Sequence, residues 1–260
     1  MIQVISIHPS DNLNPNLPDS LQHLILTLKS QPQLTPAGVR QCVMDAQIPP
    51  EDLLPWADFN HPPTDSYGRK QIYRDEGLEV MVMSWAPGDY SAIHDHGATQ
   101  WGAVQFLGHV DHYSYTLNDG ILQTQARVHF KPGDVAAVDH DLIHQMGNPG
   151  PGPCLSLHVY GCNTPQANIT GNARIFDLFE GCIQKTDGGV FFSLPDHLIN
   201  QRQMGLKGDE ETTLRHHYQM RDRLHKIVLA QAETSPLLQG KIADLEEQIL
   251  QLESKLRVST

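Results

Sequence analysis

The sequence of 260 residues predicts a mainly β fold, an antiparallel barrel or jelly roll with helices before and after it. Between residues 67 and 160, short runs rich in β-branched and aromatic residues alternate with turn residues, and no helical period separates them. The flanking segments place apolar residues at helical spacing. We therefore expect a helical cap (1–66), a barrel with the irregular segment that follows it (67–204) and a helical extension (205–260).

Two helices are expected in the cap. From residue 20 onward, four apolar residues share one helical face: Leu21, Leu24, Ile25 and Leu28. A second helix begins after Thr35, a good N-cap residue that is followed by Pro36 at the first helical position. It ends before Pro49, and one or two helical turns and a Pro-rich connection then lead to residue 66.

Five runs in the central part are predicted as strands: 78–85, 101–106, 110–117, 135–138 and 155–160. Asn118, Asp119 and Gly120 form a strong hairpin signal after the third run. Further along, residues 186–189 read as a turn and residues 190–194 as a strand. Otherwise the segment 161–203 shows no regular pattern.

The extension begins with a polar, His-rich helical pattern over residues 212–232. After Pro236, apolar residues alternate by four and three: Leu238, Ile242, Leu245, Ile249, Leu252 and Leu256. This spacing fits a parallel two-stranded coiled coil, which would join two copies of the chain through residues 236–260. It fits equally an amphipathic helix that packs on its own domain, because so short a seam barely separates the two periods.

Composition excludes several classes of protein. With 18 basic and 30 acidic residues the net charge is −12, which disfavours nucleic acid and anionic membranes as partners. No apolar run is long enough to span a bilayer, and the N-terminus lacks a secretion signal. The four cysteines have no metal-binding or redox spacing. We expect a cytoplasmic protein.

Histidine is unusually frequent, with 15 copies. His94 and His96 stand two positions apart in a predicted strand, so both side chains leave the same face. Two imidazoles in this arrangement can reach one metal ion, and His144 is the candidate third ligand from a strand adjacent in space. The remaining histidines are expected to have no metal-binding role.

Residues of this region resemble the two motifs of the cupin superfamily, which are formed here by Gly88, His94, His96 and Gly108, and then by a Pro-Gly turn, His144 and Asn148. The resemblance implies a double-stranded β-helix barrel with a metal inside its mouth. The first motif normally supplies a Glu ligand, yet Gln100 and Trp101 occupy its place. Three neutral imidazoles leave the charge of the metal uncompensated, so an anionic substrate such as a thiolate would complete the site.

A second pattern narrows the family. Ser156, His158 and Tyr160 line one face of a predicted strand and could form a hydrogen-bonded relay. Together with the three histidines and the sequence Tyr67-Gly68-Arg69, this set is similar to the cysteine dioxygenase family of thiol dioxygenases. The resemblance extends over residues 67–160.

The resemblance implies a non-haem Fe(II) enzyme that uses O2 to convert L-cysteine to cysteine sulfinic acid. His94, His96 and His144 would hold the iron. Tyr160 would donate a hydrogen bond to the reacting group, with His158 and Ser156 holding its hydroxyl. Arg69 would bind the substrate carboxylate, because a guanidinium matches its planar fork, and Tyr67 would brace Arg69.

The sequence departs from the animal members of the family, in which a cysteine near the second metal histidine can form a thioether to the active-site tyrosine. Trp101 stands at that place. We expect no crosslink, and Cys154 and Cys162 read as buried structural thiols.

Two other functions stay open. A 3-mercaptopropionate or other small-thiol dioxygenase would share the metal and relay residues, although that branch tends to carry Gln in place of Arg69. Arg174 could then supply a different carboxylate anchor. A cupin that only binds a metal or ligand, without catalysis, is the alternative from another class.

Overall fold

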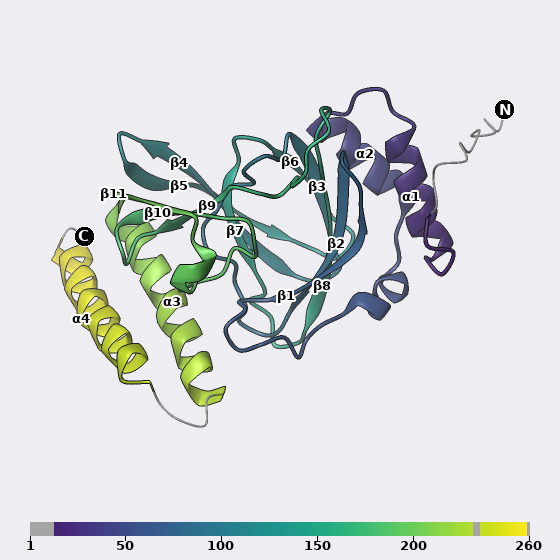
Figure 1. The fold of residues 1–260 in the computed structure, drawn as a ribbon. Coiled ribbons are helices and arrows are strands. Elements are labelled where there is room, and N and C mark those ends of the chain that lie inside the picture. The colour runs from purple at the N-terminus through teal and green to yellow at the C-terminus, as the bar shows by residue number, and fades with distance from the viewer. Residues whose placement is uncertain (1–12, 231–234, 259–260) are drawn as a thin grey trace.

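The computed structural model describes residues 13–230 and 235–258. Helices α1 (Asp19–Lys29) and α2 (Pro36–Ala46) precede the barrel, and α3 (Glu210–Ala230) and α4 (Pro236–Val258) follow it. The main strands of the barrel are β1 (Gly68–Arg74), β2 (Leu78–Trp85), β3 (Trp101–Phe106), β4 (Val110–Asn118), β5 (Ile121–Phe130), β6 (Val135–Asp139), β7 (Ile143–Gly147) and β8 (Cys154–Gly161). The two helical pairs lie on opposite sides of the barrel (Figure 1).

The strands form two sheets in the order of a jelly roll. One sheet contains β1, β2, β8, β3 and β6, in that order. In the other, β5, β4 and β7 are neighbours, and segment 90–96 lies beside β7 through two bridges, Tyr90 with Gly147 and His94 with His144. From segment 90–96 to β4, and again from β5 to β8, successive segments alternate between the sheets, so the barrel is a double-stranded β-helix. The predicted fold class is confirmed.

The central strands of the first sheet are buried on both faces. Side chains of both sheets meet in the barrel interior, among them Met81, Met83, Phe106, Val110 and Met146. The opposite face packs on α1 and α2 through a second apolar cluster, which includes Val80, Val82, Ala103, Leu157 and Val159. Strands β2, β3 and β8 are therefore buried at every position. Their bounds agree with the predicted ones to within a residue.

Local sequence signals explain the cap and the hairpin. Four apolar residues of α1 are fully or nearly fully buried, as its spacing predicts. The hydroxyl of Thr35 accepts a hydrogen bond from the backbone N–H of Gly38 at 3.2 Å, which caps α2. Asp119 and Gly120 have positive φ angles of 50° and 78°, the conformation that a tight β4–β5 hairpin requires.

The predicted strand at 190–194 is wrong. Residues 190–194 have no strand conformation, and side chains satisfy two backbone groups: the N–H groups of Val190 and Phe192 donate to the hydroxyls of Tyr67 and Ser66. The carbonyl of Val190 accepts from Ala92 N at 3.0 Å, and no neighbouring strand pairs with the segment. An apolar run alone could not distinguish this arrangement from a strand.

The segment after β8 contains strands that were not predicted, β9 (Ala173–Asp177), β10 (Cys182–Thr186) and β11 (Gln201–Met204). Strand β9 lies beside segment 90–96, where Asp95 N donates to Arg174 O at 3.0 Å and Phe176 N donates to Ile93 O at 2.8 Å. The segment that carries His94 and His96 is therefore held between β7 and β9.

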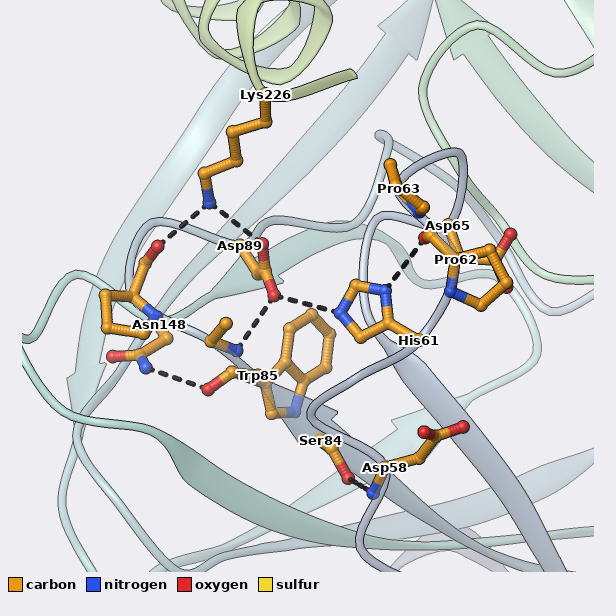
Figure 2. Close-up of polar contacts among 12 residues, drawn as sticks. Asp58, His61, Pro62, Pro63, Asp65, Ser84, Trp85, Asp89, Asn148 and Lys226 are labelled. Carbon is orange, nitrogen blue, oxygen red and sulfur yellow. Dashed lines mark hydrogen bonds and ion pairs between the residues drawn. The ribbon is translucent and has the colours of Figure 1, made fainter. Parts of the chain in front are cut away.

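Helix α3 is anchored to the barrel by two basic side chains. Arg223 donates to two backbone carbonyl groups of the connection before β1. Lys226 Nζ lies 2.9 Å from the carboxylate of Asp89, and the other carboxylate oxygen lies 3.4 Å from His61 Nε2 (Figure 2). Asp89 is almost fully buried, so this contact fixes the orientation of α3.

Helix α4 buries its apolar face within its own chain. Ile242 and Leu245 belong to the same cluster as Leu224 and Ile227 of α3. This is the amphipathic-helix alternative for the seam of residues 238–256. Residues 231 and 232, at the end of the predicted helix 212–232, lie outside the described residues. None of the helices in the described ranges has the length and the apolar character that crossing a membrane requires.

Candidate metal centre

Three histidine side chains meet inside the barrel, as the sequence predicts. His94 and His96 lie on segment 90–96, and His144 lies on β7. The backbones of His94 and His144 exchange two hydrogen bonds, with N to O distances of 2.9 and 2.8 Å. Local pairing of the two segments therefore sets the position of both side chains.

The imidazole rings converge through their Nε2 atoms. His144 Nε2 lies 3.1 Å from the Nε2 atoms of both His94 and His96. Nitrogen ligands of one first-row metal ion lie about 3 Å apart, since each is about 2.1 Å from the ion. Within residues 13–230 and 235–258, this is the only group of three or more potential ligand side chains that meets in this way.

The hydrogen bonds around the rings fit a cation at this point. His94 Nδ1 lies 2.8 Å from the carbonyl oxygen of Ala92, which can only accept, so Nδ1 carries the hydrogen and Nε2 a lone pair. His112 Nε2 lies 2.8 Å from His144 Nδ1 and can fix that ring in the same tautomer. Lone pairs that converge in a buried site need a positive charge between them, and a metal ion supplies it.

Burial keeps the three rings neutral. Loss of solvation lowers the pKa of His94 to about 4, and it lowers the pKa values of His96 and His144 well below their usual range. A neutral imidazole is the form that binds a metal. His96 Nδ1 is buried and has no hydrogen-bond partner among the described residues.

Ser156, His158 and Tyr160 form a continuous chain beside these histidines. Ser156 Oγ lies 2.8 Å from His158 Nε2, and His158 Nδ1 lies 2.8 Å from the Tyr160 hydroxyl. The Tyr160 ring lies next to His96, with centroids 5.2 Å apart. Gly102 of β3 makes room for it, because a Cβ there would lie 2.8 Å from Tyr160 Cδ1.

Arg69 and Tyr67 border the same cavity. Arg69 lies 3.7 Å from the buried carboxylate of Glu79 and contacts the hydroxyl of Thr170, which in turn donates to Glu79. The Tyr67 ring stacks on Trp85 at 4.6 Å, so it braces the cavity wall rather than bonding to Arg69. Among the described residues that line the cavity, Arg69 is the only arginine or lysine.

The cavity itself is small, about 40 Å³, and its lining combines the three histidines, the relay and apolar side chains. Met81, Met83 and Met146 form much of the apolar wall. Thr170, Ala173, Gly188 and Val190 complete it from the segment that showed no regular sequence pattern. That segment therefore shapes the site.

Several residues that the sequence analysis considered lie away from the cavity. Arg174 pairs with Asp95, with Nε 2.5 Å from Oδ2, and lines a separate surface hollow. Trp101 donates to Asn163 on the side of the cap. Neither Cys154 nor Cys162 lines the cavity, both thiols are free, and burial raises the pKa of Cys154 to about 11.

Three residues of the site were not predicted: Glu79, Trp85 and His112. Each belongs to a predicted strand and contacts a predicted site residue on another strand, which is the preceding one for Glu79 and a strand distant in sequence for Trp85 and His112. Glu79 and Trp85 share the inward-facing positions of β2 with Met81 and Met83. A polar residue at an inward position of a buried strand is the signal that could have identified Glu79.

No protein-family model matches the chain, whereas several solved structures resemble part of it. One similar structure is an uncharacterized protein with a double-stranded β-helix domain from Klebsiella pneumoniae, at 18% identity and a TM-score of 0.33, covering 44% of this chain and 89% of that one. A protein from Thermus thermophilus has 19% identity and a TM-score of 0.35, with 44% and 94% covered. The oxalate decarboxylase of Lactobacillus farciminis has 17% identity and a TM-score of 0.31, with 39% and 30% covered.

Proposed function

We propose that this chain is a non-haem Fe(II) thiol dioxygenase that adds both atoms of O2 to the sulfur of L-cysteine and yields cysteine sulfinic acid. The observation that carries the proposal is one small cavity in which an all-histidine metal site, a Ser-His-Tyr relay and an arginine meet. No other described part of the chain combines these groups.

His94, His96 and His144 would hold the iron. When bound, Fe(II) supplies the redox chemistry that couples triplet O2 to a singlet thiol. All three ligands are neutral, so the bound cation keeps its charge and favours an anionic thiolate over a neutral ligand. This feature supports a thiol as the substrate.

Arg69 would orient the substrate through its carboxylate. The guanidinium borders the cavity, and Glu79 and Thr170 contact it. Its remaining N–H groups offer the planar pair of donors that a carboxylate accepts. This favours an amino acid thiol, although 3-mercaptopropionate has the same two end groups and lacks only the amine.

Tyr160 would donate a hydrogen bond to the reacting group. Burial raises the pKa of its hydroxyl above the usual range, so the group stays protonated and remains a donor. The apolar walls exclude water, which strengthens this hydrogen bond and protects reactive species from hydrolysis.

Oxygen consumption by the iron-loaded protein tests the proposal. The protein is reconstituted with Fe(II) under anaerobic conditions and exposed to O2 with cysteine, cysteamine, 3-mercaptopropionate or glutathione, and the products are weighed by mass spectrometry. We expect one O2 consumed per cysteine and a product heavier by two oxygen atoms. His144→Ala serves as the inactive control and exposed His23→Ala as the matched active control.

Each other outcome contradicts the proposal in a defined way. Faster oxidation of 3-mercaptopropionate would assign the chain to the small-thiol alternative. If the iron-loaded protein consumed O2 with none of the four thiols, the chain would be a cupin that binds a metal without this catalysis.

A further inference from the structure

We propose that Trp85 sets the direction of the hydrogen bonds along Ser156, His158 and Tyr160, so that the Tyr160 hydroxyl is held as a donor toward the cavity. Trp85 is thus a positioning residue at the far end of the relay. The kinetic part of the test rests on the proposed function, whereas the tautomer of His158 does not.

The four side chains form one buried series. The Trp85 indole Nε1 lies 2.8 Å from Ser156 Oγ, and the two following links have the same length. Their exposed fractions are 1% for Trp85, 0% for Ser156, 2% for His158 and 4% for Tyr160. These partners are therefore shielded from bulk solvent.

The chemistry of the groups fixes the direction. An indole N–H can only donate, so Ser156 Oγ accepts from Trp85. Among the described residues, His158 Nε2 is the only other side-chain partner of Ser156 Oγ, so the serine hydroxyl hydrogen bonds to Nε2, which accepts. His158 consequently carries its hydrogen on Nδ1 and donates it to the Tyr160 oxygen. The Tyr160 hydrogen is left for a group in the cavity.

Without the indole donor, the Ser156 hydroxyl hydrogen can turn away from His158 into the vacated place, and the opposite direction becomes available. His158 Nε2–H would donate to Ser156, and His158 Nδ1 would accept from the Tyr160 hydroxyl. The hydrogen of Tyr160 would then point away from the cavity, and the hydroxyl could only accept there. The two directions have opposite consequences for catalysis, and Trp85 distinguishes between them.

The position of the indole is itself firmly fixed. Figure 2 shows that Ser84 Oγ accepts from Asp58 N and that the carbonyl of Trp85 accepts from Asn148 Nδ2, so the backbone is held before and at Trp85. On the other side, the Tyr67 ring stacks on the indole at an interplanar angle of 28°. The donor therefore stays aimed at Ser156.

The relay carries no charge that would override this order. Burial lowers the pKa of His158 to about 3 and raises the pKa of Tyr160. Both groups are neutral near pH 7, so the single hydrogen on the His158 ring reports the direction.

Nitrogen-15 NMR of the metal-free chain measures which ring nitrogen of His158 carries that hydrogen. We expect Nδ1–H in the wild type, and a mixture or the Nε2–H form in Trp85→Phe. Trp101→Phe is the matched control, because Trp101 is also a buried indole but donates to Asn163, outside the relay. It should leave the His158 signal unchanged.

A second variant keeps the test decisive if Trp85→Phe fails to fold. Replacing tryptophan by its benzothiophene analogue keeps the shape of the ring and removes only the N–H donor. An Nε2–H tautomer in the wild type, or an unchanged tautomer after either replacement, would overturn the proposal.

Turnover provides a separate readout. On the iron-loaded protein, Trp85→Phe should lower kcat by roughly tenfold with iron content and KM unchanged. Combined with Tyr160→Phe, it should add no further loss, because both changes remove the same donor. A tautomer change without any dioxygenase activity would leave this proposal standing and refute the proposed function, and an additive loss in kcat would refute the proposal alone.

Discussion

His144 offers the most direct test of the metal site at the scale of single residues, since it contacts both other candidate ligands. We expect His144→Ala to lose most of its iron, because two neutral imidazoles hold Fe(II) weakly. Metal analysis of the reconstituted protein gives the stoichiometry. Exposed His23→Ala is the control, whereas His112 is unsuitable because it contacts His144. Full iron occupancy in folded His144→Ala would remove this residue from the ligands.

The second prediction for a single residue concerns the role of Arg69 in binding cysteine. Arg69→Gln alone would leave the buried carboxylate of Glu79 without its cation, so the double variant Arg69→Gln/Glu79→Gln is the better probe. It should raise the KM for cysteine by at least about tenfold, roughly 1.4 kcal/mol, because the bidentate donor is lost.

Steady-state oxygen uptake measures that KM, and metal analysis should show unchanged iron. Glu79→Gln alone retains the guanidinium and is the matched control. Cysteine kinetics that match the wild type in the double variant would remove Arg69 from substrate binding.

Sequence could predict the residues whose partners share a strand or a short motif. Ser156, His158 and Tyr160 stand two apart on β8, so the alternation of a strand brings them together. The contacts of Trp85 and His112 reach between strands, 71 and 32 positions away in the chain. No local pattern encodes such a pairing, because it depends on how neighbouring strands are aligned within each sheet.

At the scale of elements, the anchoring of α3 gives a prediction for pH. Both partners of the His61 ring, a carboxylate oxygen of Asp89 and the carbonyl of Pro62, are acceptors, so the doubly protonated ring fits best. The hydrogen bond to Asp89 raises the pKa of His61 above its usual value of 6.5. Its stabilising contribution is therefore complete below pH 6.5 and is lost as the pH rises through the raised pKa.

We accordingly expect His61→Gln to lower the free energy of unfolding at pH 6 and to have little effect at pH 9. Urea unfolding at the two values measures the difference, with His23→Gln as the exposed control. An equal loss at both pH values would show that His61 acts through packing and carries no charge.

Elements that are buried on both faces were the easiest to predict. β2 and β3 begin and end at the predicted residues, because turn residues bound these runs. β9, β10 and β11 were missed, because four or five residues of mixed polarity give too short a pattern. Residues 190–194 have the apolar character of a strand but not its conformation, because tertiary contacts decide the conformation there.

At the scale of the whole molecule, α4 determines what a truncated chain would do. Ending the chain at Ser235 should expose Leu224 and Ile227 of α3 and remove the burial of Ile242, Leu245 and Ile249. Each fully buried apolar side chain contributes about 1.5 to 3 kcal/mol, so we expect a clearly lower Tm. Thermal unfolding followed by circular dichroism measures it.

Light scattering of the full and truncated chains then tests the proposal of a homo-oligomer through residues 236–260. A smaller assembly after truncation would support a contact between copies. The same number of chains per assembly, together with a lower Tm, would show that α4 packs only within its own chain. Leu250→Glu, on the exposed face of α4, is the matched variant, because it alters that face and leaves the contact with α3 intact.

The reciprocal backbone hydrogen bonds between His94 and His144 have a consequence for how a metal ion would be exchanged. These candidate ligands are 50 positions apart, and closing such a loop in an unfolded chain costs about 4 kcal/mol of chain entropy. Here backbone pairing closes the loop without using the imidazole nitrogens. A chelator should therefore strip the metal without unfolding the barrel, and a fresh ion can enter a finished site, so one polypeptide can be reloaded many times in its lifetime.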